Sequence, residues 1–459
     1  MPTVDDVVAA LPAEIHTIVV GGPDSNGIMR GKRLPVGQLE RVLREGLAIC
    51  DVFWVLTIDE SDLVRRPATA AGYFPTERTG YPDIIARADL STLRVVPWHD
   101  GTAFVLCDWR LPHEAGPVPL DPRHVLRTVV ERGRAMGFDA YSALELEFYL
   151  LRETPGSVLD RHPWELTPLE PRPSTYGVVM GARQEPVARL IRESMLAYGI
   201  PVEACNPETG PGQFEINLRY GPSLRAADDA FLFKSGVKEL AAQQELLATF
   251  MAKPNSDWAG NSCHAHMSLR TLDGDPAFHD DTAPHGVSEL MRHFVGGVLA
   301  SMPDLTALMA PTPNSYRRYT PYSWAGTTAT WGVDNRSTGL RAIVEGPAGT
   351  RLEHRQPGGD ANPYLVTAAM LAAGLHGIEN GIEPPEPVGS DVYAMSTPPG
   401  TALPRSLAAA VDLLEGSTTA RQWLGDDFVD HYVELKRAEV EAQALAVTDW
   451  EIRRYLDAL

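Results

Sequence analysis

"ALELEFYLL", residues 143–151, alternates glutamate with leucine and then continues as an apolar run. Successive side chains of a β-strand point to opposite faces, so a strand here sets Glu145 and Glu147 on one face, about 7 Å apart. Two like charges at that spacing need a cation or solvent between them. The segment therefore predicts a strand that carries either a solvated face or a cation site.

Further strands are expected on both sides of this one, where short β-branched or aromatic runs are bounded by Gly, Pro or Asp. They cover residues 15–20, 52–58, 103–108, 201–205, 213–220, 262–269, 338–344 and 351–355. Helices are expected at residues 122–136, 184–198, 225–251, 287–301, 362–379, 403–424 and 430–457. Because strands and helices do not alternate, the order predicts an α+β fold with a largely antiparallel sheet.

The first quarter of the chain reads as a small β-rich unit. Residues 111–122 are the best linker candidate, and Asp121 and Pro122 then supply the N-cap and the first-turn proline of a helix. A length of 459 residues is enough for two or three domains with a large core.

Composition and local sequence patterns argue against several classes of function. A net charge of -20 disfavours binding to a nucleic-acid backbone or an anionic membrane surface. The N-terminus lacks a signal-peptide pattern, and the longest apolar helix, around residues 364–378, is too short for a membrane span. The four cysteines have no CxxC spacing, which fits a reducing compartment, so a cytoplasmic location is expected.

Three more motifs carry polar chemistry. Glu208 precedes a Gly-Pro-Gly turn and Glu215 lies on the strand after it. His264 and His266 share one face of a strand, which favours a metal or phosphate site over two unrelated core histidines. In the segment RLEHRQPGG, two arginines flank Glu353 on one face, as suits a carboxylate ligand beside anion-binding guanidiniums.

Together these motifs place five glutamates and a histidine on or beside strands, with six arginines between residues 317 and 355. Oxygen ligands with one imidazole favour Mg²⁺ or Mn²⁺ over zinc, and six ligands suffice for two ions. Two divalent ions beside an arginine cluster suit phosphoryl transfer from a nucleotide. The chain has neither a P-loop nor a kinase signature, so the nucleotide must be held in another way.

Across nearly its whole length the sequence resembles the glutamine synthetase family. The resemblance rests on the ordered motifs Glu-x-Glu, the acids around GPGQ, His-x-His-x-Ser, NSYRR, DNRSTGLR and RLEHR…GGDANPYL, with DSNGIMRGKRLP near the start. It implies a small N-terminal β-grasp domain at residues 1–113. It also implies a catalytic domain at residues 114–459, with a curved antiparallel sheet and surrounding helices, that binds ATP, two metal ions and glutamate.

The resemblance also implies roles for individual residues. One metal ion is expected on Glu147, Glu208 and Glu215, and a second on Glu145, His264 and Glu353. The nucleotide contacts are expected from Glu203, Tyr220, His266, Ser268, Arg341 and Arg351. Glutamate is expected on Gly260, Arg318 and Arg355, and the transferred phosphoryl group on Arg336. The implied reaction forms γ-glutamyl phosphate from ATP and glutamate, and a nitrogen nucleophile then displaces phosphate.

The sequence departs from the family pattern at the site for the nitrogen nucleophile. Members that use ammonia have a glutamate six residues after the arginine at 318, and here that position is Trp324. A neutral indole cannot pair with ammonium by charge, whereas its bulk suits an apolar substituent. The family's second ammonium-site acid has its candidate counterpart in Asp51, and the asparagine of its glutamate-binding loop is replaced by Ala259.

These departures predict an organic monoamine as the acceptor, such as ethanolamine or an alkyl or aryl amine. Polyamines, ammonia in an ordinary glutamine synthetase, a catalytically silent homologue and a single-metal hydrolase remain alternatives. The resemblance also implies a homo-oligomer of two stacked hexameric rings, with each active site lying between subunits.

Overall fold

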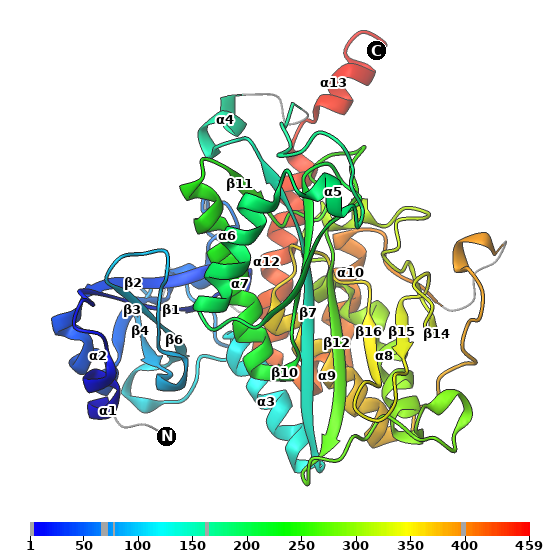
Figure 1. The fold of residues 1–459 in the computed structure, drawn as a ribbon, viewed down its shortest axis with the longest axis horizontal. Helices are drawn as coiled ribbons and strands as arrows, with labels where there is room; N and C mark the ends of the chain where they lie inside the picture. Colours follow the sequence, from blue (N-terminus) through cyan, green and yellow to red (C-terminus); the bar gives the residue numbers. More distant parts are fainter. Residues whose placement is uncertain (1–3, 66–71, 77–78, 161–164, 396–400) are drawn as a thin grey trace.

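A computed structural model describes residues 4–65, 72–76, 79–160, 165–395 and 401–459. The chain is an α+β protein built on two sheets, as predicted (Figure 1). The smaller sheet lies within the N-terminal part of the chain. The larger one is surrounded by helices and carries most of the polar motifs.

The smaller sheet has six strands in the order β2-β1-β6-β4-β3, with β5 paired to β6. Its strands are β1 (Thr17–Pro23), β2 (Met29–Pro35), β3 (Leu47–Cys50), β4 (Asp83–Ala88), β5 (Arg94–Val95) and β6 (Thr102–Arg110). Two short helices, α1 (Val4–Ala10) and α2 (Leu39–Glu45), lie in the same part of the chain. A separate hydrophobic core, which includes Ile18, Val105 and Trp109, holds this unit together.

The larger sheet has nine strands in the order β14-β15-β16-β12-β7-β9-β8, with β10 and β11 paired to β7. Every pair is antiparallel except β14 with β15. The strands are β7 (Phe138–Leu151), β8 (Val202–Pro207), β9 (Gln213–Leu218), β10 (Gly221–Pro222), β11 (Leu247–Thr249), β12 (Cys263–Thr271), β14 (Trp331–Val333), β15 (Leu340–Ile343) and β16 (Arg351–His354). A further pair, β13 (Thr328–Ala329) with β17 (Thr401–Ala402), stands apart from it.

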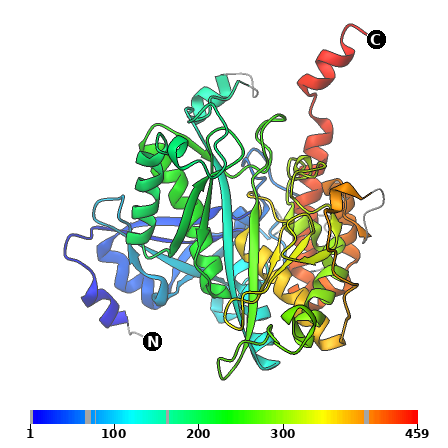
Figure 2. The same cartoon turned by 45° about the vertical axis from the view of Figure 1, so that its right-hand side comes forward.

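Helices cover the larger sheet (Figures 1 and 2). The helices in this part of the chain are α3 (Pro122–Ala135), α4 (Pro155–Asp160), α5 (Val178–Gly181), α6 (Glu185–Ala197), α7 (Ser223–Gln243), α8 (Glu289–Met309), α9 (Pro363–Asn380), α10 (Leu407–Gly416), α11 (Thr418–Leu424), α12 (Asp426–Leu445) and α13 (Asp449–Tyr455), of which α13 projects away from the sheet (Figure 1). Helices α8 and α9 pack closely because Gly297 meets Gly377, and a Cβ on Gly297 would lie 2.5 Å from Gly377 Cα. Among the described helices, none combines the length and hydropathy needed to cross a bilayer.

Most predicted elements are confirmed, and several boundaries are wrong. Residues 52–58 are not a strand, because Asp51–Val55 forms a 3₁₀-helix in which Phe53 and Trp54 pack against Trp109. The helix predicted at residues 225–251 ends at Gln243, and strand β11 follows it. The two C-terminal helices predicted at residues 403–424 and 430–457 are each divided in two, whereas α8 continues through Pro303 to Met309.

The connection between the sheets runs from Arg110, where β6 ends, to Pro122, where α3 begins. The Asp121 carboxylate accepts the backbone N–H of Arg123 at 2.9 Å, so the predicted helix cap is confirmed. The strands of the smaller sheet precede this connection in the chain, and those of the larger sheet follow it. A domain boundary at residue 113 is compatible with this arrangement and stays a prediction.

Candidate active site

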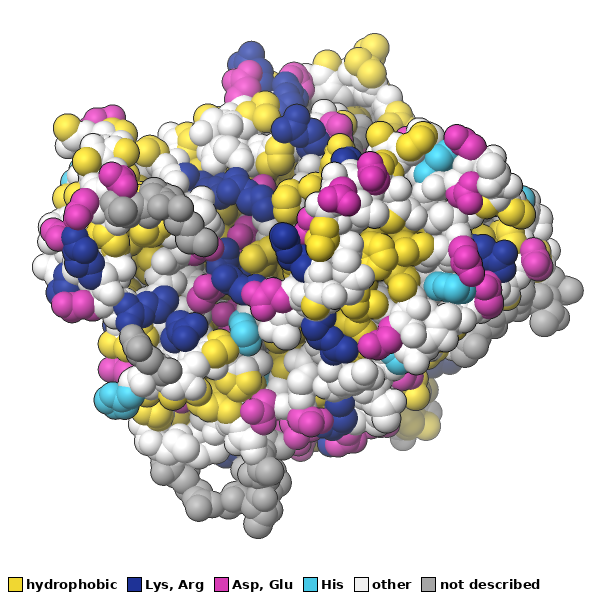
Figure 3. Space-filling view, turned by 90° about the horizontal axis from the view of Figure 1, so that it is seen from below, with side chains coloured by type: hydrophobic (Ala, Val, Ile, Leu, Met, Phe, Trp, Pro, Cys, Tyr) yellow, Lys and Arg dark blue, Asp and Glu magenta, His cyan; other side chains and the backbone are white. Residues whose placement is uncertain are grey.

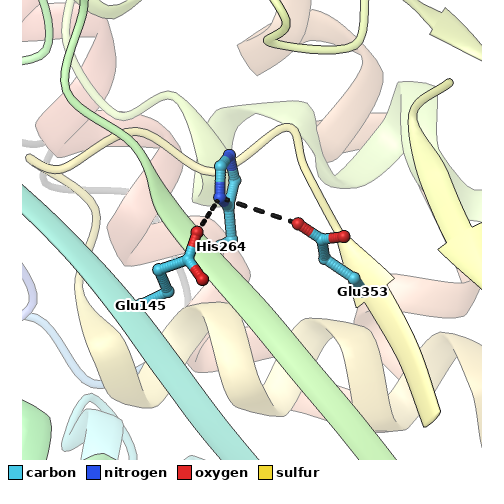
Figure 4. Close-up of side chains that lie close together, drawn as sticks. All are labelled: Glu145, His264 and Glu353. Carbon is cyan, nitrogen blue, oxygen red and sulfur yellow. Dashed lines mark hydrogen bonds and ion pairs between the residues drawn. The ribbon is translucent and has the colours of Figure 1, made fainter. Parts of the chain in front are cut away.

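Three neighbouring strands of the larger sheet each contribute one ligand-type side chain to a common point (Figure 4). Glu145 on β7 lies opposite His264 on β12, and Glu353 on β16 is one strand further along. His264 Nδ1 is 2.6 Å from a Glu145 oxygen and 3.7 Å from a Glu353 oxygen. One potential ligand atom from each residue lies within 4.8 Å of the others, which is close enough to surround a divalent cation.

Electrostatics keeps these three groups in the forms that bind a cation. Burial opposes ionisation of Glu145 and Glu353, but neighbours outweigh it and lower both pKa values, that of Glu353 to about 2. The main opposing contributions are hydrogen bonds from His264 and His266 at Glu145, and the Arg355 charge at Glu353. Burial lowers the pKa of His264, which favours the neutral imidazole that can coordinate a metal.

A second group of carboxylates lies next to Glu145, on the side of β7 that pairs with β9. Glu147 on β7 is directly opposite Glu215 on β9, and Glu208 precedes β9. Burial and the Glu208 charge raise the pKa of Glu147 to about 7. Burial, followed by the charges of Glu145 and Glu147, raises the pKa of Glu215 to about 9. These carboxylates repel one another in the bare protein, so a bound cation would relieve an electrostatic cost.

The arginines that are predicted to bind anions differ in the groups that they contact within the protein. Arg318 is buried, and it donates to the Gln356 carbonyl at 2.9 Å and to the Ser262 hydroxyl at 3.3 Å. Within the described chain, no carboxylate forms an ion pair with Arg318, so its charge is available to an anionic ligand. A Cβ on Gly260 would lie 2.1 Å from Arg318 Cγ, which shows why only glycine fits beside this arginine.

Arg341 and Arg355 instead hold Glu353. Arg341 donates to one Glu353 oxygen at 3.1 Å, and Arg355 donates to the other. Arg355 also reaches the backbone carbonyl of Trp324 at 3.4 Å. Arg336 is exposed at the edge of the site and forms no hydrogen bond or ion pair with another described residue.

Two adjoining cavities contain almost all of the predicted residues. The larger cavity, of about 640 Å³, is lined by both groups of candidate metal ligands. Its other predicted residues are Gly260, Arg318, Trp324, Arg336, Arg341 and Arg355. The smaller, about 430 Å³, is lined by Glu203, Tyr220, His266, Ser268 and Arg351, all predicted to contact the nucleotide. Glu145 lines both, whereas the predicted nucleotide contact Arg341 lines the larger one.

Trp324 belongs to an aromatic edge of the larger cavity. Its side chain is 51% exposed, and its ring meets that of Tyr393 edge-on at 6.3 Å. Trp324 and the nearby Tyr322 both have positive φ angles, of 59° and 61°, which are uncommon for bulky residues. This backbone conformation presents a large apolar surface where the family pattern has an acid.

Asp51 is the predicted site residue that lines neither described cavity. Its side chain is 1% exposed and accepts a hydrogen bond from the Tyr73 hydroxyl at 3.2 Å. Burial raises its pKa to about 6. Within a single chain, Asp51 therefore does not lie in a cavity with the other predicted site residues.

The lining residues of the larger cavity that escaped the sequence prediction include Tyr176, Lys253, Asp257 and Trp258. Tyr176 lies in an irregular segment before α5, which carries no motif of its own. The other three lie on the loop that leads to Gly260. Their closeness in sequence to this predicted glutamate-binding glycine is the feature that could have indicated their place in the cavity.

Comparisons with known proteins agree with this geometry. Residues 119–455 match the family model described as glutamine synthetase, catalytic domain. A glutamate–isopropylamine ligase from a Pseudomonas species is 38% identical over 447 residues, covering 97% of this chain and 96% of that protein. A γ-glutamylethanolamide synthetase from Streptomyces coelicolor is 39% identical over 450 residues, covering 97% and 94%.

Solved structures give the same result for the fold. GmaS in complex with ADP matches with a TM-score of 0.85 at 29% identity, covering 99% of this chain and 100% of that one. The family model, the two relatives that match nearly the whole chain, and the clustered acids and arginines all support the same family assignment. The chain belongs to the glutamine synthetase family and is an ATP-dependent ligase that forms carbon–nitrogen bonds.

Proposed function

We propose that this enzyme joins the γ-carboxylate of L-glutamate to a small organic monoamine. The observation that carries the proposal is Trp324, an indole on the wall of the larger cavity at the position where ammonia-using members carry a glutamate. An apolar ring attracts the body of an organic amine by burial of its surface, and it offers no carboxylate to ammonium. The names of the isopropylamine and ethanolamine relatives support the same class of acceptor.

In the proposed reaction, Arg318, Arg355 and the backbone at Gly260 hold glutamate in the larger cavity. ATP lies in the smaller cavity, with its terminal phosphate directed toward Glu145 where the cavities adjoin. A γ-carboxylate oxygen attacks the terminal phosphorus, ADP leaves, and Arg336 neutralises charge on the moving phosphoryl group. The amine nitrogen then attacks the acyl carbon, phosphate leaves with its bonding electrons, and the nitrogen loses a proton.

Two divalent cations, Mg²⁺ or Mn²⁺, fit the donor groups present. Glu145, His264 and Glu353 would hold one, and Glu147, Glu208 and Glu215 would hold the other. Bound there, such ions would supply charge neutralisation for the phosphate oxygens. The raised pKa values of Glu147 and Glu215 support a cation site here, because a bound cation would reduce the repulsion between these closely spaced carboxylates.

Metal binding should strengthen as the pH rises from 6 to 8.5. Since the pKa values of Glu147 and Glu215 are raised in the fold, their protons disfavour metal binding at low pH, and their ionisation destabilises the bare protein at high pH. We expect affinity to change by about tenfold per pH unit for each proton released. Thermal unfolding with Mg²⁺ or EDTA would measure the effect.

A Glu215→Gln variant is the matched control for this pH dependence. It removes the acid with the most strongly raised pKa, so the change in metal affinity with pH should become shallower. Equal stabilisation by Mg²⁺ at pH 6 and pH 8.5 in the unaltered enzyme would contradict the proposed ligand set.

The proposal includes an assembly of two stacked hexameric rings in the cytoplasm. In it, the N-terminal domain, residues 1–113, of one subunit completes the catalytic domain, residues 114–459, of the next. Asp51 would then act only across such an interface, because it lines neither cavity of its own chain. Light scattering combined with activity tests this, since a fully active monomer would refute it.

A panel of amines tests the function directly. Phosphate release would be followed with ATP, Mg²⁺, glutamate and one of ammonium, methylamine, ethanolamine, isopropylamine, aniline, putrescine or spermine. We expect one organic monoamine to have a kcat/KM at least about tenfold above that of ammonium, which corresponds to the burial of one or two methylene groups. If ammonium is the best acceptor, the enzyme is a glutamine synthetase with an altered loop at Trp324.

A further inference from the structure

The two arginines that are proposed to hold glutamate come from segments that lie apart in the sequence. Arg318 ends a 3₁₀-helix, Ser315–Arg318, and Arg355 directly follows strand β16. One glutamate molecule can contact both arginines only if the two segments are held at a fixed spacing. The contacts between segment 312–319 and segment 355–361 therefore decide the shape of the proposed glutamate site.

Arg318 itself joins the two segments at the wall of the larger cavity. Its guanidinium donates to the Gln356 carbonyl at 2.9 Å. The hydroxyl of the next residue, Tyr319, donates to the same carbonyl at 3.2 Å. Because the donors and the acceptor lie on different segments, the position of the Arg318 guanidinium depends on how these segments pack.

Asp360 joins the same two segments at a second point. One of its carboxylate oxygens accepts the Ser315 hydroxyl at 2.6 Å and the Thr312 hydroxyl at 2.9 Å. In turn, the Ser315 hydroxyl accepts the Thr312 backbone N–H at 3.0 Å, and the Thr312 hydroxyl accepts the Ser315 backbone N–H at 3.2 Å. The carboxylate thus fixes the turn at which the helix carrying Arg318 begins.

The second carboxylate oxygen of Asp360 lies close to Arg318. It is buried and has no hydrogen-bond partner within the described chain. A Cβ on Gly358 would lie 2.5 Å from this oxygen and 3.3 Å from the Arg318 guanidinium, so both charged groups approach the same glycine. Since Arg318 is only 2% exposed, a negative charge at this position favours its burial.

Segment 355–361 is also held from the side of helix α7. The Lys234 ammonium donates to the carbonyl of Gly359 at 2.8 Å and to that of Ala361 at 2.9 Å. These two carbonyls belong to the residues on either side of Asp360. Asp360 therefore projects from a fixed backbone, and its carboxylate can set the position of the other segment.

We propose that Asp360 is a positioning residue for glutamate, which fixes the turn at residues 312–315 and thereby holds the Arg318 guanidinium in place relative to Arg355. Asp360 lines neither described cavity, so it acts through Arg318 and does not touch the substrate. This inference rests on the proposed function only in its assignment of the two arginines to glutamate. It does not depend on which amine is the acceptor.

Asp360→Ala and Asp360→Asn test the role. Alanine removes the charge and the hydrogen-bond acceptor, so the KM for glutamate should rise by about tenfold or more, as expected when a binding group is displaced. The KM for ATP should stay unchanged, because neither Asp360 nor the two arginines line the smaller cavity. Asparagine keeps an acceptor for the two hydroxyls, so it should restore most of the affinity for glutamate.

Ser315→Ala tests the proposed route to Arg318. It removes the donor of the shorter hydrogen bond to Asp360, so the KM for glutamate should again rise. When Asp360→Ala and Ser315→Ala are combined, the rise should be smaller than the product of the two single effects, because both changes break the same contact. Calorimetric titration with glutamate and thermal unfolding would accompany the kinetics of each variant.

Asp273→Ala is the matched control. It removes a carboxylate from an exposed turn that lines neither described cavity, so every KM should stay unchanged. Acidic and basic side chains are interspersed over the face drawn in Figure 3. The loss of one exposed acid from such a surface has little effect on a distant site.

Two results would overturn the assignment. An unchanged KM for glutamate in folded Asp360→Ala would show that the carboxylate does not position Arg318, and equal rises in the KM values for glutamate and ATP would show a general structural role. If Asp360→Ala does not fold, Ser315→Ala decides, since a raised KM for glutamate supports the proposal and an unchanged one overturns it. Each KM is measured with the acceptor that the unaltered enzyme uses best, so a preference for ammonium would refute the organic acceptor and leave this test intact.

Discussion

Replacing Glu353 by glutamine should lower phosphate release with ATP, glutamate and amine by about a thousandfold or more. Glu353 is buried where its carboxylate meets Arg341, Arg355 and His264. A neutral amide is a much poorer ligand for a hard cation, and a catalytic metal contributes several kcal/mol of charge stabilisation. Since each 1.4 kcal/mol or so corresponds to tenfold in rate, the loss reaches this size.

Glutamine is preferred to alanine here because Arg355 pairs with Glu353, whereas Arg341 pairs with both Glu353 and Asp334. Removing the side chain would leave the buried Arg355 charge without its carboxylate partner, so a loss of activity would not be distinguished from a loss of folding. Circular dichroism and thermal unfolding would check the fold, and calorimetric titration with Mn²⁺ would count the sites.

Glu383→Gln is the matched control for Glu353→Gln. Glu383 is exposed and pairs with Arg292 at 2.6 Å, away from both cavities. We expect this variant to keep full activity and both metal sites. Near-normal turnover by folded Glu353→Gln would remove Glu353 from the proposed metal ligands.

The sequence predicted the centre of the larger sheet well because strand periodicity acts locally. In β7, the alternation of Glu145 and Glu147 with leucines fixes which face is polar, and the structure extends that strand back to Phe138. The same parity in β12 and β16 brings His264 and Glu353 to one point. Side-chain direction in a strand therefore identified the candidate ligands, whereas their grouping around one metal ion came from the resemblance to the family.

The errors occurred where tertiary packing overrides local preference. Residues 52–58 are aromatic and β-branched, as strands often are, yet Phe53 and Trp54 turn inward against Trp109 from a 3₁₀-helix. Asp257 and Tyr176 were missed for a related reason. They lie on loops, where no periodicity tells which side chains face a cavity formed by distant segments.

Replacing Trp324 by glutamate should shift the preference from organic amines toward ammonium by about a hundredfold in the ratio of kcat/KM values. Two effects multiply. The new carboxylate can pair with ammonium, which contributes about 1.5–3 kcal/mol, and the lost indole costs an organic amine about 1–3 kcal/mol of apolar contact. Because residue 324 already has a positive φ with a bulky side chain, glutamate adds no new backbone strain.

Trp324→Gln separates the two effects, since it removes the indole but adds no charge. It should lose turnover of the organic amine without gaining turnover of ammonium. A competing outcome is that the new carboxylate pairs with Arg355, which already contacts the backbone at Trp324, and this would appear as a raised KM for glutamate. If both variants keep the preference of the unaltered enzyme, Trp324 does not contact the acceptor and the organic-amine proposal loses its main support.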